Sequence, residues 1–188
     1  MIGNLAVGIQ DFVIPAPLGD FQSIATVTVG SGGATEIEFT SIASTWQHLQ
    51  IRGISRSTHS ATSSAIYIYF NSDTGTNFSN HGLFGDGASA GSFGTANTSN
   101  GGGAYTAGAT STASIFGAVI IDVLDYKDTN KYTTSRLLSG ADFNGSGQVR
   151  FASGSWRNTA AVTTITIKDA NGGNLAQYSH FALYGIKG

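Results

Sequence analysis

From about residue 21 to the end of the chain, most windows alternate apolar and polar residues with a period of two. Residues 35–42 place Ile37 and Phe39 between acidic and hydroxyl side chains, and residues 48–54 place Leu49 and Ile51 opposite polar neighbours. Successive side chains of a β-strand point to opposite faces, so this period is typical of strands buried on one side. No segment shows helical spacing with a capping pattern. The chain is therefore expected to be all-β.

Turn sequences rich in Gly, Asn and Asp separate about eight to ten such segments. This number and spacing predict an antiparallel β-sandwich, with the jelly roll as the favoured form. Residues 24–29 and 35–42 are expected to form a hairpin through Gly30–Gly33, and residues 171–174 a second hairpin turn. The most apolar run, residues 114–124, is expected to be a central strand buried on both faces. The expected strands are residues 24–29, 35–42, 48–54, 65–70, 114–124, 131–141, 147–156, 161–168 and 176–186.

The proline pair Pro15 and Pro17 marks a stiff, extended connection near the start of the chain. We therefore divide the sequence into an N-terminal arm, residues 1–20, and a single β-sandwich domain, residues 21–188; an ordinary edge strand is the alternative for the first residues. Residues 79–113 carry few large apolar side chains, which predicts a long surface loop, with the Gly/Ser/Thr-rich part at 86–113. The last strand keeps its aromatic pattern to the end, which favours a central place in a sheet or a subunit interface.

Composition narrows the possible functions. The net charge is −2 and charged residues make up 11% of the chain, which argues against a dedicated nucleic-acid binder. No apolar run is long enough to span a bilayer, so no membrane partner is expected. The chain has no Cys, which excludes disulfides and thiolate chemistry. The first twenty residues lack the basic start and unbroken apolar stretch of a secretory signal, so synthesis in the cytoplasm without export by that route is expected.

Motifs for catalysis or metal binding are weak. Asp73-Thr-Gly matches the aspartic-protease tripeptide but occurs once, after polar residues, and is more typical of a turn. Asp122, Asp125 and Asp128 could supply oxygen ligands to Ca²⁺, but a turn with solvated acids fits their spacing better. The four His residues are scattered without a zinc-binding pattern. We therefore predict no enzyme activity, no cofactor and no metal.

Aromatic side chains on a β-surface can also stack on sugar rings. Each Trp and Tyr is individually more typical of a core or interface, because these side chains bury their bodies while satisfying one polar tip. Tyr105 and Trp156 are the candidates that we single out for glycan contact.

The C-terminal sequence, residues 177–188 (QYSHFALYGIKG), resembles the ending of a family of small tailed-bacteriophage virion structural proteins. Residues 39–53, 69–75 and 156–167 fit the same pattern, so the resemblance covers about residues 25 to 188. It is a whole-domain pattern without a catalytic signature. The resemblance implies a non-enzymatic structural protein located on the virion, without indicating which part of the particle.

Two function classes follow from this resemblance. The first is a surface-exposed capsid decoration, cement or spike subunit held by contacts with phage capsid or tail proteins. The alternative is a receptor-binding tail or fibre module that recognises host-surface glycan, with an isolated carbohydrate-binding module as a weaker third. A homo-oligomer, favoured as a trimer, is expected with the C-terminal strand near its axis. The predicted interface residues are Phe181, Leu183, Tyr184 and Ile186, and the predicted virion-anchoring residues are Phe12, Ile14, Pro15, Pro17 and Leu18.

Overall fold

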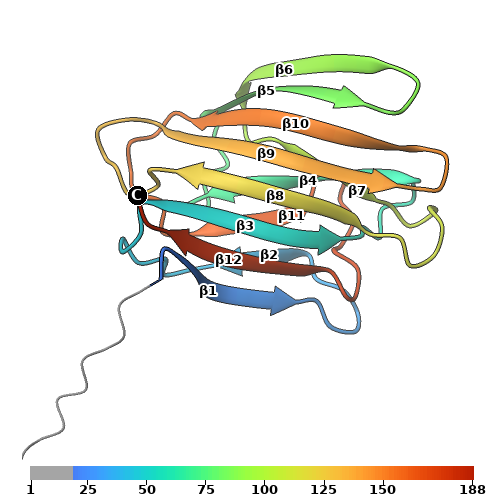
Figure 1. Cartoon of the computed structure of the whole chain (residues 1–188), viewed down its shortest axis with the longest axis horizontal. Helices are drawn as coiled ribbons and strands as arrows, with labels where there is room; N and C mark the ends of the chain where they lie inside the picture. The colour runs from blue at the N-terminus through green and yellow to red at the C-terminus, as the bar shows by residue number, and fades with distance from the viewer. Residues whose placement is uncertain (1–18) are drawn as a thin grey trace, which may run out of the picture.

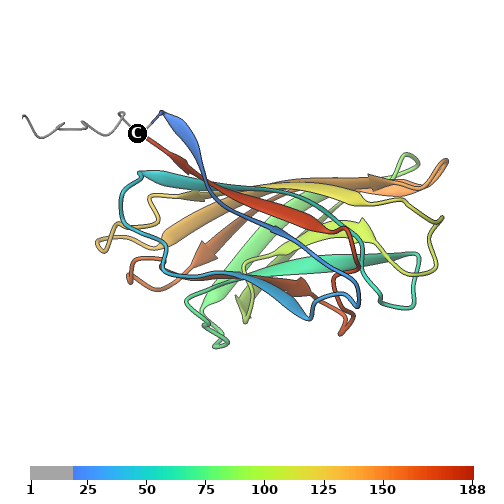
Figure 2. The same cartoon turned by 90° about the horizontal axis from the view of Figure 1, so that it is seen from below.

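The computed structural model describes residues 19–188 as twelve antiparallel strands in two packed sheets (Figures 1 and 2). The predicted anchoring residues, Phe12 to Leu18, lie outside the described residues. The structure confirms an all-β sandwich, while the jelly-roll form stays a prediction. The strands are β1 Phe21–Thr28, β2 Glu36–Phe39, β3 His48–Ser55, β4 Ser63–Phe70, β5 Phe78–Gly85, β6 Ala90–Thr98, β7 Gly103–Ala107, β8 Gly117–Leu124, β9 Thr133–Asp142, β10 Gly147–Trp156, β11 Ile165–Asp169 and β12 His180–Ile186.

The two sheets are unequal in size. The large sheet has eight strands in the order β1-β12-β3-β8-β9-β10-β5-β6, and the small sheet has four in the order β2-β11-β4-β7. Figure 1 views the large sheet from outside, with the small sheet behind it. No helix among residues 19–188 has the length and apolarity that crossing a bilayer would require. Because the small sheet covers only one side of the large sheet, the other side of the large sheet is a broad outer face.

The inner faces of the two sheets form the hydrophobic core. Phe70, Phe78 and Trp156 pack together with ring centroids 5.8 to 6.2 Å apart. The buried indole donates a hydrogen bond from Nε1 to Oδ2 of Asp73 at 2.7 Å, which satisfies its one polar group. Contacts of this kind explain why the alternating strands predicted from sequence fold into a sandwich rather than an open sheet.

Two expected hairpins are wrong. Residues 24–29 belong to β1, which pairs with β12 in the large sheet, whereas β2 pairs with β11 in the small sheet. The connection after β11 also changes sheets, so the turn at 171–174 joins no hairpin. The two connections lie side by side, because Ala34 and Leu175 exchange backbone hydrogen bonds of 2.9 and 2.8 Å. This pairing holds the β1–β2 and β11–β12 connections next to each other where both pass between the large and the small sheet.

The region 79–113 is not the predicted loop, because it contains β5, β6 and β7. Small residues allow close pairing of β5 with β6: the Phe93 ring covers Gly82, and the Phe84 ring covers Gly91. A Cβ atom at either glycine would collide with the opposite ring. The few large side chains of this segment therefore lie flat across the partner strand and shield its backbone.

The C-terminal strand occupies an interior position in the large sheet. Strand β12 pairs with β1 on one edge and with β3 on the other. The sequence predicted that this strand lies either centrally in a sheet or in a subunit interface, and the structure shows it within a sheet. Strand β12 thereby closes the core on its Phe181 and Leu183 side.

Strand β8 departs from expectation in a different way. It lies in the middle of the large sheet between β3 and β9, yet its residues alternate between buried and exposed. Burial on both faces is therefore wrong for this chain by itself, because the small sheet covers only the inner face. The outer side chains of β8 include the apolar Ala118 and Ile120, which are open to solvent.

Candidate functional site

The most distinctive surface of the molecule is an apolar ridge on the outer face of the large sheet. Ile120 of β8, Leu138 of β9, Phe151 of β10 and Leu83 of β5 are consecutive cross-strand partners. Their exposed fractions are 39%, 49%, 53% and 62%. Cross-strand neighbours contact one another, so the four side chains form a continuous row across four strands.

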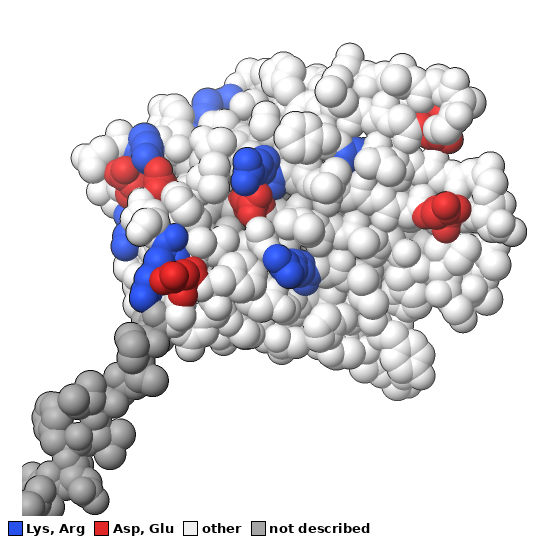
Figure 3. Space-filling model, viewed as in Figure 1, with Lys and Arg blue, Asp and Glu red and all other residues white. Residues whose placement is uncertain are grey.

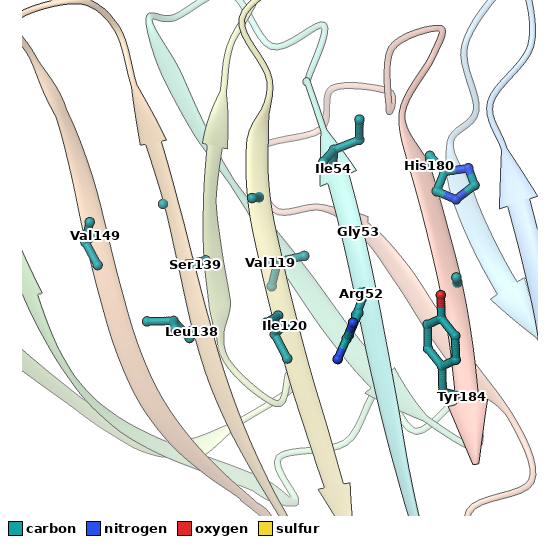
Figure 4. Close-up of a pocket in the computed structure, with 13 residues that line it drawn as sticks. Arg52, Gly53, Ile54, Val119, Ile120, Leu138, Ser139, Val149, His180 and Tyr184 are labelled. Atoms are coloured by element: carbon teal, nitrogen blue, oxygen red, sulfur yellow. The ribbon is translucent and has the colours of Figure 1, made fainter. Parts of the chain in front are cut away.

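A hollow runs beside the ridge. On each strand it lies two residues away from the ridge residue, so both rows face the same side of the sheet. Ala118, Gly140 and Val149 are consecutive cross-strand partners in this second row, and Ile54 pairs with Ala118 at its β3 end. The hollow has a volume of about 590 Å³, and Figure 4 shows its lining. The small side chains of Ala118 and Gly140 leave this space between the larger Ile54 and Val149.

Polar side chains border the ridge on its other side. Asp122 accepts hydrogen bonds from Gln50 Nε2 and Arg136 Nε, each at 2.7 Å. Arg52 donates to Gln50 Oε1 at 2.8 Å. The polar groups of this row therefore satisfy one another within the chain.

A stacked aromatic pair lies at the β1 and β12 end of the outer face, where Tyr184 also lines the hollow. The Phe21 and Tyr184 rings stack with centroids 4.7 Å apart. The Arg52 guanidinium lies 5.0 Å from the first ring centroid and 5.7 Å from the second, within cation–π range. At the other end of β12, His180 Nδ1 forms a hydrogen bond of 2.8 Å with the Thr28 hydroxyl.

The ridge and hollow form one continuous exposed apolar patch. The six large side chains Ile54, Leu83, Ile120, Leu138, Val149 and Phe151 are 39% to 62% exposed. Together they present on the order of 500 Å² of apolar surface, a size at which the largest apolar patch of a soluble protein is often functional. Figure 3 shows this face largely free of charged side chains between a few isolated groups. The arrangement is suited to holding another apolar surface.

The acidic residues singled out in the sequence have structural partners. In the turn after β8, hydrogen bonds from Lys131 and Gln47 hold the pKa of Asp125 below its ordinary value. Asp128 lies 3.5 Å from the same Lys131. Within residues 19–188, no three His, Asp or Glu side chains gather as a metal site would require.

Asp73 is a turn residue that supports the core. Its carboxylate accepts hydrogen bonds from Gly75 N at 2.8 Å, from the Asn77 side chain and from the Trp156 indole. Burial acts to raise the pKa of Asp73, but the hydrogen bonds from Trp156, Asn77 and Gly75 lower it overall. The carboxylate thus stabilises the turn and the indole together.

The predicted glycan contacts lie apart from the apolar patch. Trp156 is 1% exposed in the core, so its assignment as a surface contact is wrong. Tyr105, on β7, is half-buried; its ring centroid lies 5.9 Å from that of Phe143, and the Arg150 guanidinium lies 5.2 Å from it. A role for Tyr105 in glycan contact stays a prediction.

The predicted oligomer interface divides into two groups. Phe181 and Leu183 are fully buried within the protomer, where a partner subunit cannot touch them, so this assignment is wrong for both. Tyr184 and Ile186 point to the outer face and stay predictions. The error arises because inner and outer residues alternate along β12 while both are apolar.

Sequence reasoning missed the ridge and the hollow. Two signals were available: the run at 114–124 has apolar residues in both alternating sets, and Leu138 directly follows Leu137. In a strand, adjacent apolar residues lie on opposite faces, so one of each pair had to face away from the core. The earlier interpretation assigned that second face to burial inside the domain.

Comparison with known proteins adds no relative: no family model, no curated protein and no solved structure matches this chain.

Proposed function

We propose that this protein is a non-enzymatic structural protein of a tailed-bacteriophage virion, a capsid decoration, cement or spike subunit held by protein–protein contacts. The observation that carries the proposal is the apolar ridge and hollow on the outer face of the large sheet. A surface of this composition is costly to leave in water and is satisfied by packing against protein. The virion assignment itself comes from the resemblance of residues 25–188 to that family.

The receptor-binding alternative has less support. Glycan sites use exposed aromatic rings with polar groups directed at sugar hydroxyls. Trp156 is buried, and the large exposed side chains of the outer face are mainly aliphatic. A surface of Ile, Leu and Val offers a sugar few hydrogen bonds. We therefore favour the structural role.

The proposal is tested on particles. An antibody raised against the purified protein is applied to density-gradient fractions from a lysate of the source phage or its induced host. The protein should band with intact virions in a fixed ratio to the major capsid protein. Recovery in the soluble fraction alone would rule out a virion role.

Copy number then separates the two classes. A ratio of the same order as the major capsid protein supports decoration or cement, whereas a few copies per particle indicate a tail location. Particles lacking the protein should also lose stability to heat or low salt if it acts as cement. Unchanged particle stability together with impaired host adsorption would favour the receptor-binding alternative.

A further inference from the structure

We propose that the outer face of the large sheet binds the same face of a second copy of this chain, sheet against sheet, about a two-fold axis. This inference rests on the proposed structural role, for which it names the partner of the apolar patch. Three features of the face support it: the raised row of side chains with a hollow beside it, the area of the face, and the order of charged residues along β9.

The ridge of one copy and the hollow of a second copy are complementary in shape. The ridge is formed by Ile120, Leu138 and Phe151. The floor of the hollow, formed by Ala118 and Gly140, lies two residues away from the ridge along β8 and β9. A two-fold axis placed between these rows and parallel to them sets Ile120 and Leu138 of each copy over Ala118 and Gly140 of the other. On β10 the same axis brings Phe151 of one copy against Val149 of the other. The floor of each copy is then filled by Ile120 and Leu138 of the other, as close packing at an interface requires.

The size of the face suits a stable pair. Eight strands at about 4.8 Å spacing span roughly 38 Å, and strands of this length extend about 25 Å. The projected area of the whole face is therefore on the order of 900 Å², of which the apolar patch supplies on the order of 500 Å²; a standard specific interface buries about 800 Å² per partner. Two such faces can meet at the distance of about 10 Å typical of stacked sheets.

Charges along β9 match under the same operation. The outward residues of this strand are, in order, Thr134, Arg136, Leu138, Gly140 and Asp142. An axis between Leu138 and Gly140 places Arg136 of one copy opposite Asp142 of the other, twice per dimer. Arg136 is held in position by Asp122 at 2.7 Å, and Asp142 is exposed. Opposite charges therefore meet at the borders of the apolar centre, which fixes the register of the pair.

Oligomeric state gives the first test. The full chain is measured by light scattering behind gel filtration and by sedimentation over a range of concentrations. The wild-type protein should be a dimer, and Leu138→Asp should raise its dissociation constant by roughly a hundredfold, because the new charge is buried without a partner. Tyr132→Asp is the matched control: Tyr132 is 52% exposed but lies before β9, away from the ridge, and its variant should remain a dimer. Circular dichroism and a melting curve show that both variants fold.

A charge reversal tests the register. Asp142→Arg should weaken the dimer by opposing Arg136 of the second copy. The double variant Arg136→Asp with Asp142→Arg should regain part of the affinity, because the new carboxylate on β9 faces Asp142→Arg of the other copy but also lies beside Asp122 of its own chain. Because the chain has no Cys, Leu138→Cys can be joined only between copies by a short bismaleimide, which gives a second readout. Tyr132→Cys should not be joined.

Several results would overturn the inference. A wild-type monomer at every concentration, or a trimer that Leu138→Asp leaves intact, excludes the two-fold face pairing. Loss of the dimer on deletion of residues 1–18, with Leu138→Asp without effect, would assign the contact to the N-terminal segment. If the protein bands with virions while failing these tests, the proposed function stands and the inference alone is wrong.

Discussion

The outer faces of the two sheets differ sharply in chemistry, although both sheets follow the same alternating pattern. On the small sheet, Glu36, Glu38 and Lys168 face outward; Thr166 donates a hydrogen bond of 3.1 Å to Glu38, and Lys168 lies 4.6 Å from the Tyr69 ring centroid. On the large sheet, the equivalent outward positions carry the apolar ridge. Water can hydrate the charged groups on the outer face of the small sheet. The apolar side chains on the outer face of the large sheet are instead stabilised by packing against another apolar surface. The comparison supports the proposal that the large sheet is the side that assembles.

Strand β9 gives the sharpest test, because Leu137 and Leu138 are neighbours on opposite faces. Leu137→Ala should lower the free energy of unfolding by about 2–5 kcal/mol, since it opens a cavity in the core. Leu138→Ala should change it by less than about 1 kcal/mol in dilute protein, where its side chain is half exposed. Urea denaturation of both variants measures the difference. Equal losses would show that the outer face supports the fold itself.

A buried carboxylate provides the next largest effect. Asp169, on β11, accepts hydrogen bonds from Ser64 Oγ at 2.6 Å, Asn171 N at 2.7 Å and Gly173 N at 2.9 Å. Asp169→Asn removes the charge that strengthens these bonds and should cost about 1–3 kcal/mol of stability. Denaturation at neutral pH measures this loss, with Asp142→Asn on the exposed end of β9 as the control.

Acid should remove the same stabilisation. Burial raises the pKa of Asp169, but its hydrogen bonds, first from Ser64, outweigh burial and leave the pKa lowered from its ordinary value of 3.8. A group with a lowered folded pKa stabilises the protein above its unfolded pKa and loses that contribution as pH falls through the folded value. Wild type should therefore lose more stability than Asp169→Asn between about pH 5 and pH 2. Parallel pH profiles would contradict this role.

The smallest effects are expected on the outer face of the small sheet. Lys168→Ala and Glu38→Gln should each change the free energy of unfolding by less than about 0.5 kcal/mol, because solvent screens exposed charges. Neither variant should alter the mass measured by light scattering. A change in association on either substitution would remove the functional distinction between the two faces.

Much of the sandwich could be predicted from the sequence, because local alternation reports which residues face a core. The segment of β10 was expected at residues 147–156 and forms there. The pairing partners of β1 and β2 could not be predicted, because the change of sheet depends on the contact between Ala34 and Leu175, far apart in the chain. Strands β5 to β7 were missed because rings shield glycines from the partner strand, a contact that composition does not reveal.

The candidate site was harder to predict than the fold. Alternation separates two faces of a strand but does not say whether a second sheet covers each one, so Ile120 was assigned to burial. The same limit explains Phe181 and Trp156, whose apolar or aromatic character suits a core and an interface equally well. Only the assembled sheet shows that Ile120, Leu138, Phe151 and Leu83 form one row.

The most direct test of the central claim is side-chain oxidation footprinting of the protein on intact virions and in dilute solution. We expect Leu138, Phe151 and Leu83 to be labelled in protein diluted below the dissociation constant of the dimer and to be protected on the particle, while Tyr69 and Tyr132 are labelled equally in both. Equal labelling of the ridge in the two states would contradict the claim that the outer face of the large sheet is the assembly surface.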